Sequence, residues 1–354
     1  MLDPTYKIEI PEQSDIKNQC SLGTCHLYSW VSLLEHDYKM LTKADIKIST
    51  HYLSALHWRR RSLEMLDSSG DDQVNVKMGA HVYASRRSIL NSGIIPDEAW
   101  TGSRDFQSAP LAARITEYIK NITARAKWDI SKQTDSVKAK AIREKARNEI
   151  LAIFENLVGK IPTFFTFQGK EFTPTSFQKT YFSDLNKPIT QIFVSPIRKA
   201  RTSLDQSGQL FTIITTDLDT VESTTRKLLD HGQNVYISYE HNGQFVDAKS
   251  GVMSISAFDF PSGAGPLSRD QRAFFKTESN GHAVQIVGYD IDPRTNKVIK
   301  WKLKNSWGDK SGDHGYYHMY NDYFRAFITS ISFFSNPDFT PKVIDKIPTQ
   351  LDIF

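Results

Sequence analysis

The apolar pattern of this chain changes its period part-way along, and that change limits the folds open to it. Between residues 25 and 160, apolar side chains recur at three- and four-residue spacings, which predicts buried or amphipathic helices. From about residue 185 they stand in short β-rich runs, such as 211–216 and 235–240. The sequence therefore predicts an α+β fold in which most helices precede most strands.

Length and composition narrow the class further. The 354 residues exceed the ~150 of a typical domain, so two domains or one large domain are expected. With 39% hydrophobic and 24% charged residues, the chain is predicted to be a soluble globular protein. The formal charge of +4 requires no nucleic-acid partner, and no apolar run approaches the ~18 residues of a membrane span. Two cysteines cannot form a disulfide scaffold.

Local patterns place individual elements along the chain. Gly93 is expected to end a helix, and Asp219 with Glu222 indicates a capping box on a short helix that Gly232 ends. Two exposed amphipathic helices are expected within residues 105–160. The other helices are predicted at 25–40, 49–66 and 79–92, and the later strands at 282–290, 298–307 and 315–320.

Cys25 is the candidate nucleophile. It follows Gly23 and Thr24 at the predicted start of an apolar helix, where backbone N–H groups and the helix dipole favour a thiolate over a thiol. The alternative for a single cysteine is a buried structural side chain. The sequence around Cys25 decides between the two.

Three segments occur in an order that resembles the papain family of cysteine peptidases. Residues 18–29 (NQCSLGTCHLYS) resemble the family's signature around its catalytic cysteine. Residues 281–289 (GHAVQIVGY) resemble its histidine strand, and 304–308 (KNSWG) its asparagine loop. The separation from Cys25 to His282 exceeds the ~130–150 residues of short papain-type enzymes, which implies an insertion.

The insertion narrows the resemblance to the bleomycin hydrolase and aminopeptidase C branch. Residues 149–177 and 272–282 resemble segments of that branch, and the likeness spans most of the chain. Two features depart from it. Only 24 residues precede Cys25, and the tail after Phe334 is shorter than the branch's tail.

The resemblance implies a papain-like two-lobed α+β fold with a helical lobe, an antiparallel β-barrel-like lobe and a helical insertion. The expected parts are residues 1–100, the helical lobe with Cys25; 101–205, the inserted, mainly helical segment; 206–335, the β-rich lobe with His282 and Asn305; and 336–354, the C-terminal tail.

The resemblance also implies a role for each site residue. Cys25 would attack the carbonyl, His282 would move protons, and Asn305 would orient the imidazole. Gln19 would join the Cys25 backbone N–H in stabilising the oxyanion, while Trp307 would shield the bond between His282 and Asn305. Expected substrate contacts are Met78, Gly79, Gly281, Ala283 and Trp307, and glycine at 79 suits a close approach of another main chain.

Three positions near the nucleophile depart from the family pattern. Cys20 stands where glycine is usual, Leu22 where a disulfide-forming cysteine is common, and His26 where tryptophan is common. His26 is expected to make a packing or polar contact. The departures motivate an alternative, a catalytically silent peptide-binding protein on the same scaffold. His314 and His318 are not expected to bind a metal, and no cofactor is expected.

Within the peptidase class the sequence leaves several alternatives. The short N-terminal segment and the short tail favour an open-cleft endopeptidase or dipeptidase. The resemblance to the bleomycin hydrolase branch favours instead an aminopeptidase whose tail blocks one side of the cleft. Acyl transfer or isopeptide hydrolysis by the same residues stays open. Peptides or proteins are the expected substrates. The start of the chain, a short distance before Gln19, favours secretion after removal of a leader and of a prosegment that could act as inhibitor; the lack of disulfides points instead to the cytoplasm.

Overall fold

The structure is a computed structural model that describes residues 3–11, 13–68, 74–195, 199–204, 210–261, 263–279 and 281–340. The chain divides into two compact units. Unit 1 contains the chain up to Asn18, the segment Tyr28–Leu41 and the chain from Asp184 onward. Unit 2 contains Gln19–Leu27 and Thr42–Ser183. The tail expected at 336–354 lies outside the described residues from position 341 on.

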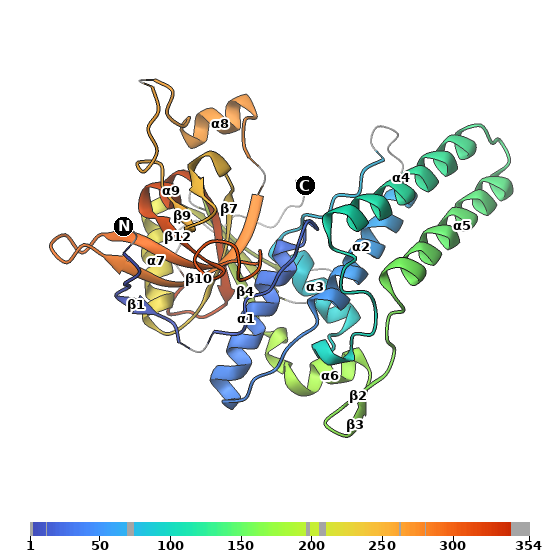
Figure 1. Cartoon of the computed structure of the whole chain (residues 1–354), viewed down its shortest axis with the longest axis horizontal. Coiled ribbons are helices and arrows are strands. Elements are labelled where there is room, and N and C mark those ends of the chain that lie inside the picture. Colours follow the sequence, from blue (N-terminus) through green and yellow to red (C-terminus); the bar gives the residue numbers. More distant parts are fainter. Residues whose placement is uncertain are drawn as a thin grey trace. The chain divides into compact units, whose positions relative to one another are not determined.

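Unit 2 is mainly helical, as the apolar spacing predicts (Figure 1). Helix α1 begins in this unit at Cys25, and α4 and α5 pack against each other as a hairpin. A π-helical turn at Phe154–Val158 follows α5. The helices are α1 (Cys25–Thr42), α2 (Thr50–Asp67), α3 (Val82–Ser92), α4 (Ala109–Ser131), α5 (Ser136–Ile153) and α6 (Pro174–Tyr181), with short elements at Asp97–Ala99, β2 (Phe165–Phe167) and β3 (Lys170–Phe172).

Local signals set several helix ends in unit 2. The Ser49 side chain accepts a hydrogen bond from the backbone of Tyr52 and caps α2, and Thr173 forms a capping box with Ser176 at the start of α6. Gly93 follows α3 at a φ of +71°, and a Cβ there would lie 2.2 Å from the Pro174 carbonyl carbon. Glycine is therefore required both by the backbone conformation and by the close approach of α6.

Unit 1 contains one large, mostly antiparallel sheet in the order β5-β6-β4-β13-β7-β10-β11-β12-β9-β8, with β1 paired to β10. The β4–β6 and β12–β9 pairs are parallel. The strands are β1 (Ile8–Glu9), β4 (Ile189–Val194), β5 (Lys199–Leu204), β6 (Leu210–Thr216), β7 (Val235–Glu240), β8 (Val246–Asp247), β9 (Val252–Met253), β10 (Gly281–Ile291), β11 (Val298–Lys304), β12 (Tyr316–Tyr320) and β13 (Ile328–Phe334). Single helical turns lie at Ser183–Asn186 and Gly243–Phe245.

Helices α7 (Leu218–Asp230) and α9 (Asn321–Phe327) contribute to the core of this sheet, and α8 spans Arg269–Phe275. The cap of α7 is Asp217, whose carboxylate accepts from the backbone of Thr220 at 2.8 Å. The predicted capping box of Asp219 and Glu222 is therefore wrong, because Asp219 already lies in the first turn. Within the described residues, no helix combines the length and apolar character needed to cross a membrane.

Lysines at alternate positions of β11 hold the N-terminal segment of unit 1. Lys300 donates to the carbonyl of Asp3, Lys302 pairs with Glu9, and Lys304 donates to Ser14 Oγ at 2.7 Å. Successive alternate residues of a strand share a face, so the three ammonium groups form one row. The segment then reaches the asparagine loop, where the Gly308 N–H donates to the Lys17 carbonyl and Asn18 pairs with Trp307.

Candidate active site

The histidine motif lies in unit 1 and carries a defined hydrogen bond. His282 on β10 is 7% exposed, and its Nε2 lies 2.9 Å from Asn305 Oδ1. An amide oxygen only accepts, so Nε2 carries the hydrogen and Nδ1 is the nitrogen left for proton exchange. Asn305 follows β11, and its backbone N–H donates to Gly315 O, which fixes the loop.

Trp307 covers this pair. Its ring stacks on His282 with centroids 4.5 Å apart and planes 19° apart. The structure thus brings together three predicted residues, His282, Asn305 and Trp307. It also adds His241, which directly follows β7 and contacts both rings, at 5.9 Å from His282 and 5.1 Å from Trp307. No sequence motif marks His241, because its position depends on the pairing of β7 with β10.

Burial controls the protonation of His282. It lowers the pKa of His282 to about 4, against a smaller opposing effect of the bond to Asn305. Nearby His241 lowers the pKa of His282 further, and burial lowers the pKa of His241 itself. Within unit 1, His282 is therefore a neutral imidazole at pH 7, the form that can take up a proton.

The cysteine motif lies in unit 2. Cys25 is the partly exposed first residue of α1, as the sequence predicts. The Leu22 carbonyl accepts hydrogen bonds from Gln19 Nε2 at 3.0 Å and from the Thr24 backbone N–H at 2.7 Å. Both bonds lie within the loop before α1 and stabilise its conformation. Cys20 is exposed, has a φ of +52° and forms no disulfide with Cys25.

Two buried histidines of unit 2 hold the predicted substrate segment. The Met78 carbonyl accepts from His57 Nε2 at 2.8 Å and from His26 Nε2 at 3.2 Å. Ser85 Oγ bonds His26 Nδ1, and Arg60 donates to His57 Nδ1. These contacts assign the Nε2–H tautomer to both rings. Burial lowers the pKa of His26 to about 3 and that of His57 to about 4, so both are neutral.

The remaining predicted substrate contacts have different surroundings. A Cβ at Gly79 would meet no atom within 4 Å, so nothing described in unit 2 itself requires glycine there. Gly281 is exposed at the start of β10. Ala283 is buried, and its carbonyl accepts from Ser29 Oγ at 2.7 Å. Across the described ranges, histidine, cysteine and acidic side chains form no group of three or more that could hold a metal ion.

The sequence profile of the peptidase C1-like family matches residues 86–353. This chain belongs to that family. Aminopeptidase W of Lactobacillus delbrueckii subsp. lactis is 22% identical over 94% of this chain and 83% of its own length. Mitochondrial cysteine proteinase 1 of Saccharomyces cerevisiae (strain YJM789) is 22% identical over 90% of this chain and 74% of its own length.

A solved structure agrees at the level of the fold. The crystal structure of PepW from Lactobacillus rhamnosis HN001 has a TM-score of 0.74 at 19% identity, covering 96% of this chain and 83% of that one. The predicted papain-like α+β fold is confirmed, and so is the predicted enzyme class. The chain is a papain-like cysteine peptidase.

Proposed function

We propose that Cys25 and His282 act together to hydrolyse peptide bonds through a thioester. The observation that carries the proposal is the Nε2 bond from His282 to Asn305 beneath Trp307, because it directs Nδ1 to proton transfer. The Cys25 position at the start of α1 supplies N–H groups that favour a thiolate.

The reaction balances with these groups alone. His282 Nδ1 takes the proton of the Cys25 thiol, and the sulfur bonds to the substrate carbonyl carbon. The C–N bond then breaks as His282 gives that proton to the leaving amine. His282 then takes a proton from water, the hydroxide oxygen bonds to the carbonyl carbon, and the C–S bond breaks. The low pKa of His282, about 4, means that protonating it at pH 6.5 costs ~3 kcal/mol within unit 1. In the proposed mechanism the negative charge of the Cys25 thiolate offsets this cost.

Gln19 and the Cys25 backbone N–H are proposed to stabilise the oxyanion. Gln19 is 6% exposed, and the bond from Nε2 to the Leu22 carbonyl fixes the orientation of its amide. A fixed donor needs no reorganisation when charge develops on the carbonyl oxygen. Met78, Gly79, Gly281, Ala283 and Trp307 remain the proposed substrate contacts.

For the cleavage mode, we propose removal of N-terminal residues from peptides. The support comes from relatives: aminopeptidases W and G of L. delbrueckii and aminopeptidase C of Listeria innocua align over most of this chain. An open-cleft endopeptidase or dipeptidase, which the short tail favours, is the competing hypothesis. The experiment compares fluorogenic peptides with free and with blocked amines, before and after deletion of residues 345–354.

Three outcomes separate these hypotheses. Cleavage of the free-amine peptide alone, with deletion conferring activity on the blocked peptide, supports a tail-gated aminopeptidase. Cleavage of both peptides by the intact chain refutes it and supports the open cleft. No cleavage of either peptide, together with binding of both, supports the silent peptide-binding alternative.

A further inference from the structure

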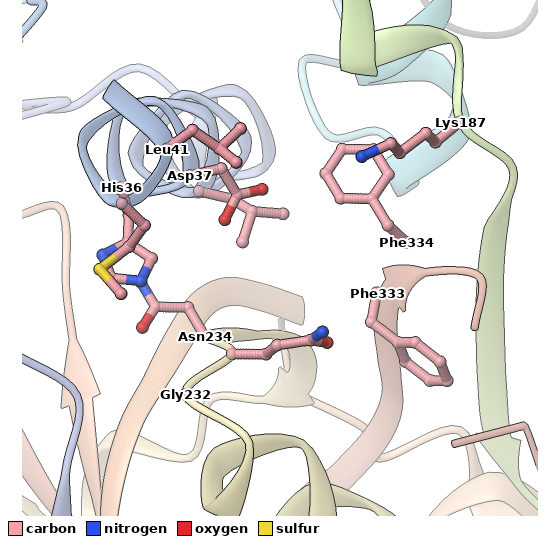
Figure 2. Close-up of a pocket in the computed structure, with 11 residues that line it drawn as sticks. His36, Asp37, Leu41, Lys187, Gly232, Asn234, Phe333 and Phe334 are labelled. Atoms are coloured by element: carbon pink, nitrogen blue, oxygen red, sulfur yellow. The ribbon is translucent and has the colours of Figure 1, made fainter. Parts of the chain in front are cut away.

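His241 belongs to a cluster of four rings in unit 1, and the proposed chemistry gives it no role. The cluster consists of Tyr239, His241, His282 and Trp307, whose contacting ring centroids lie between 4.5 and 5.9 Å apart. It is separate from the pocket of about 250 Å³ beside the C-terminal half of α1, which none of the four residues lines (Figure 2). The contacts of His241 therefore belong to the surroundings of His282.

His241 lies beside the stack that His282 and Trp307 form. Its ring centroid is 5.9 Å from that of His282 and 5.1 Å from that of Trp307, and its plane is tilted by 69° and 81° to theirs. On an outer face of the stack, His241 would be much farther from one ring than from the other. The similar distances place its ring across the edge of the stack, where it limits the sideways movement of Trp307 over His282.

A second ring packs edge to face with Trp307. Tyr317 on β12 contacts Trp307 at 5.5 Å with the planes 83° apart, and Tyr317 is only 1% exposed. Its hydroxyl lies 2.7 Å from Ser311 Oγ, which fixes this contact. Trp307 itself is partly exposed. Loss of the His241 ring would therefore leave Trp307 with fewer contacts and give water access to the bond that Trp307 covers.

The backbone on both sides of His241 is anchored. The Glu240 carboxylate accepts a hydrogen bond from Arg272 Nε at 2.8 Å, and both side chains are buried. The Asn242 backbone N–H donates to Tyr323 Oη, also at 2.8 Å. His241 thus stands between two fixed residues, so its ring is held in place before any substrate binds.

Tyr239 links the two imidazoles of the cluster. It pairs with His282 across β7 and β10, and the two rings contact each other at 5.7 Å. Its hydroxyl lies 3.3 Å from His241 Nδ1, which orients the His241 ring. His282 is therefore surrounded by three rings, those of Tyr239, His241 and Trp307.

We propose that His241 is a positioning residue for His282: its ring holds Trp307 over the bond from His282 Nε2 to Asn305 and keeps water away from that bond. A hydrogen bond is stronger where water is excluded, and this one leaves Nδ1 as the nitrogen that exchanges protons. The role rests on the proposed function, because His241 acts through His282.

The first test follows the hydrogen on His282 Nε2 in the full-length chain at pH 7. It gives an imidazole signal in ¹H–¹⁵N NMR, assigned by its absence from His282→Ala, and its exchange with solvent reports water access to the bond. His241→Ala is expected to speed this exchange at least ~10-fold, whereas His241→Phe, which keeps an aromatic ring, stays within ~3-fold of wild type. Gln244→Ala is the matched control, because Gln244 is exposed in the helical turn that follows, and it should change nothing.

The second test separates kcat from KM with a fluorogenic peptide. A poorly oriented His282 slows proton transfer but does not weaken peptide binding, so His241→Ala should lower kcat at least ~10-fold and leave KM within ~3-fold of wild type. His241→Phe should restore most of the lost kcat. His241→Gln, which has no ring but keeps an acceptor for Tyr239, should behave like His241→Ala and replaces it if that variant does not fold.

Four results would overturn the proposal. They are an unchanged exchange rate in His241→Ala, an unchanged kcat in that variant, equal losses in His241→Phe and His241→Ala, and exchange in wild type too fast for the Nε2 hydrogen to be observed. If wild type shows no turnover, the peptidase proposal fails, while faster exchange in His241→Ala still supports the hold of His241 on Trp307. Turnover in wild type that His241→Ala leaves unchanged refutes the positioning role alone.

Discussion

Acidification is expected to destabilise unit 2 through the two histidines that hold the Met78 carbonyl. Burial keeps the pKa of His26 at about 3 and that of His57 at about 4, below the 6.5 of an unfolded histidine. As the pH falls below 6.5 toward 4, the unfolded chain therefore binds protons on these two histidines, whereas the folded chain leaves them unprotonated. The resulting stability is fully present above pH 6.5 and is lost as the pH falls toward 4.

The size of the effect follows from these values. At pH 5 an unfolded histidine is almost fully protonated and the buried ones are almost fully neutral, so each lowers the free energy of unfolding by ~2 kcal/mol relative to pH 7. His57→Gln retains an amide N–H for the Met78 carbonyl but cannot titrate. Its loss of stability between pH 7 and pH 5 should therefore be ~2 kcal/mol smaller than that of wild type.

The assay is urea unfolding at pH 7 and pH 5, followed by circular dichroism. His81→Gln is the matched control, because His81 is exposed and its side chain makes no capping hydrogen bond. His282 titrates alike in all three proteins and cancels from the comparison. An identical pH dependence for wild type and His57→Gln would refute the argument that buried neutral histidines set the acid limit.

Three further outcomes are expected. Iodoacetamide followed by peptide mapping should modify Cys25 faster than Cys20, because partial desolvation of the exposed Cys20 residue and the charge of Asp105 raise the pKa of its thiol; faster labelling of Cys20 would exclude Cys25 as the activated thiol. In a fluorogenic peptide assay, His282→Ala should lower turnover at least ~100-fold while Asn305→Ala retains measurable turnover, and the reverse order would contradict their roles. Gly288→Ala should lower the free energy of unfolding by ~2 kcal/mol, because its Cβ would lie 2.6 Å from a β1 carbonyl oxygen; an unchanged urea midpoint would show that β1 can shift freely.

Local sequence patterns predicted helices, strands and the residue types at the candidate site. Helix α1 starts at Cys25 as predicted, because its apolar spacing and the absence of glycine and proline are local properties. The motifs around His282 and Asn305 could also be recognised in the sequence, because each consists of residues that lie close together in the chain. The predicted N-terminal cap of α7 was wrong by two residues. Several acidic side chains near Asp217 can cap a helix, and the sequence does not show which of them does so.

Tertiary structure alone decided which distant groups meet. His241 reaches His282 and Trp307 only because β7 pairs with β10, and His57 shares the Met78 carbonyl with His26 only because α2 packs near the start of α1. No local pattern marks such residues. Hydrogen bonds, burial and the pKa shifts they cause act between neighbours in space, and strand pairing and helix packing create those neighbours from segments far apart in the chain.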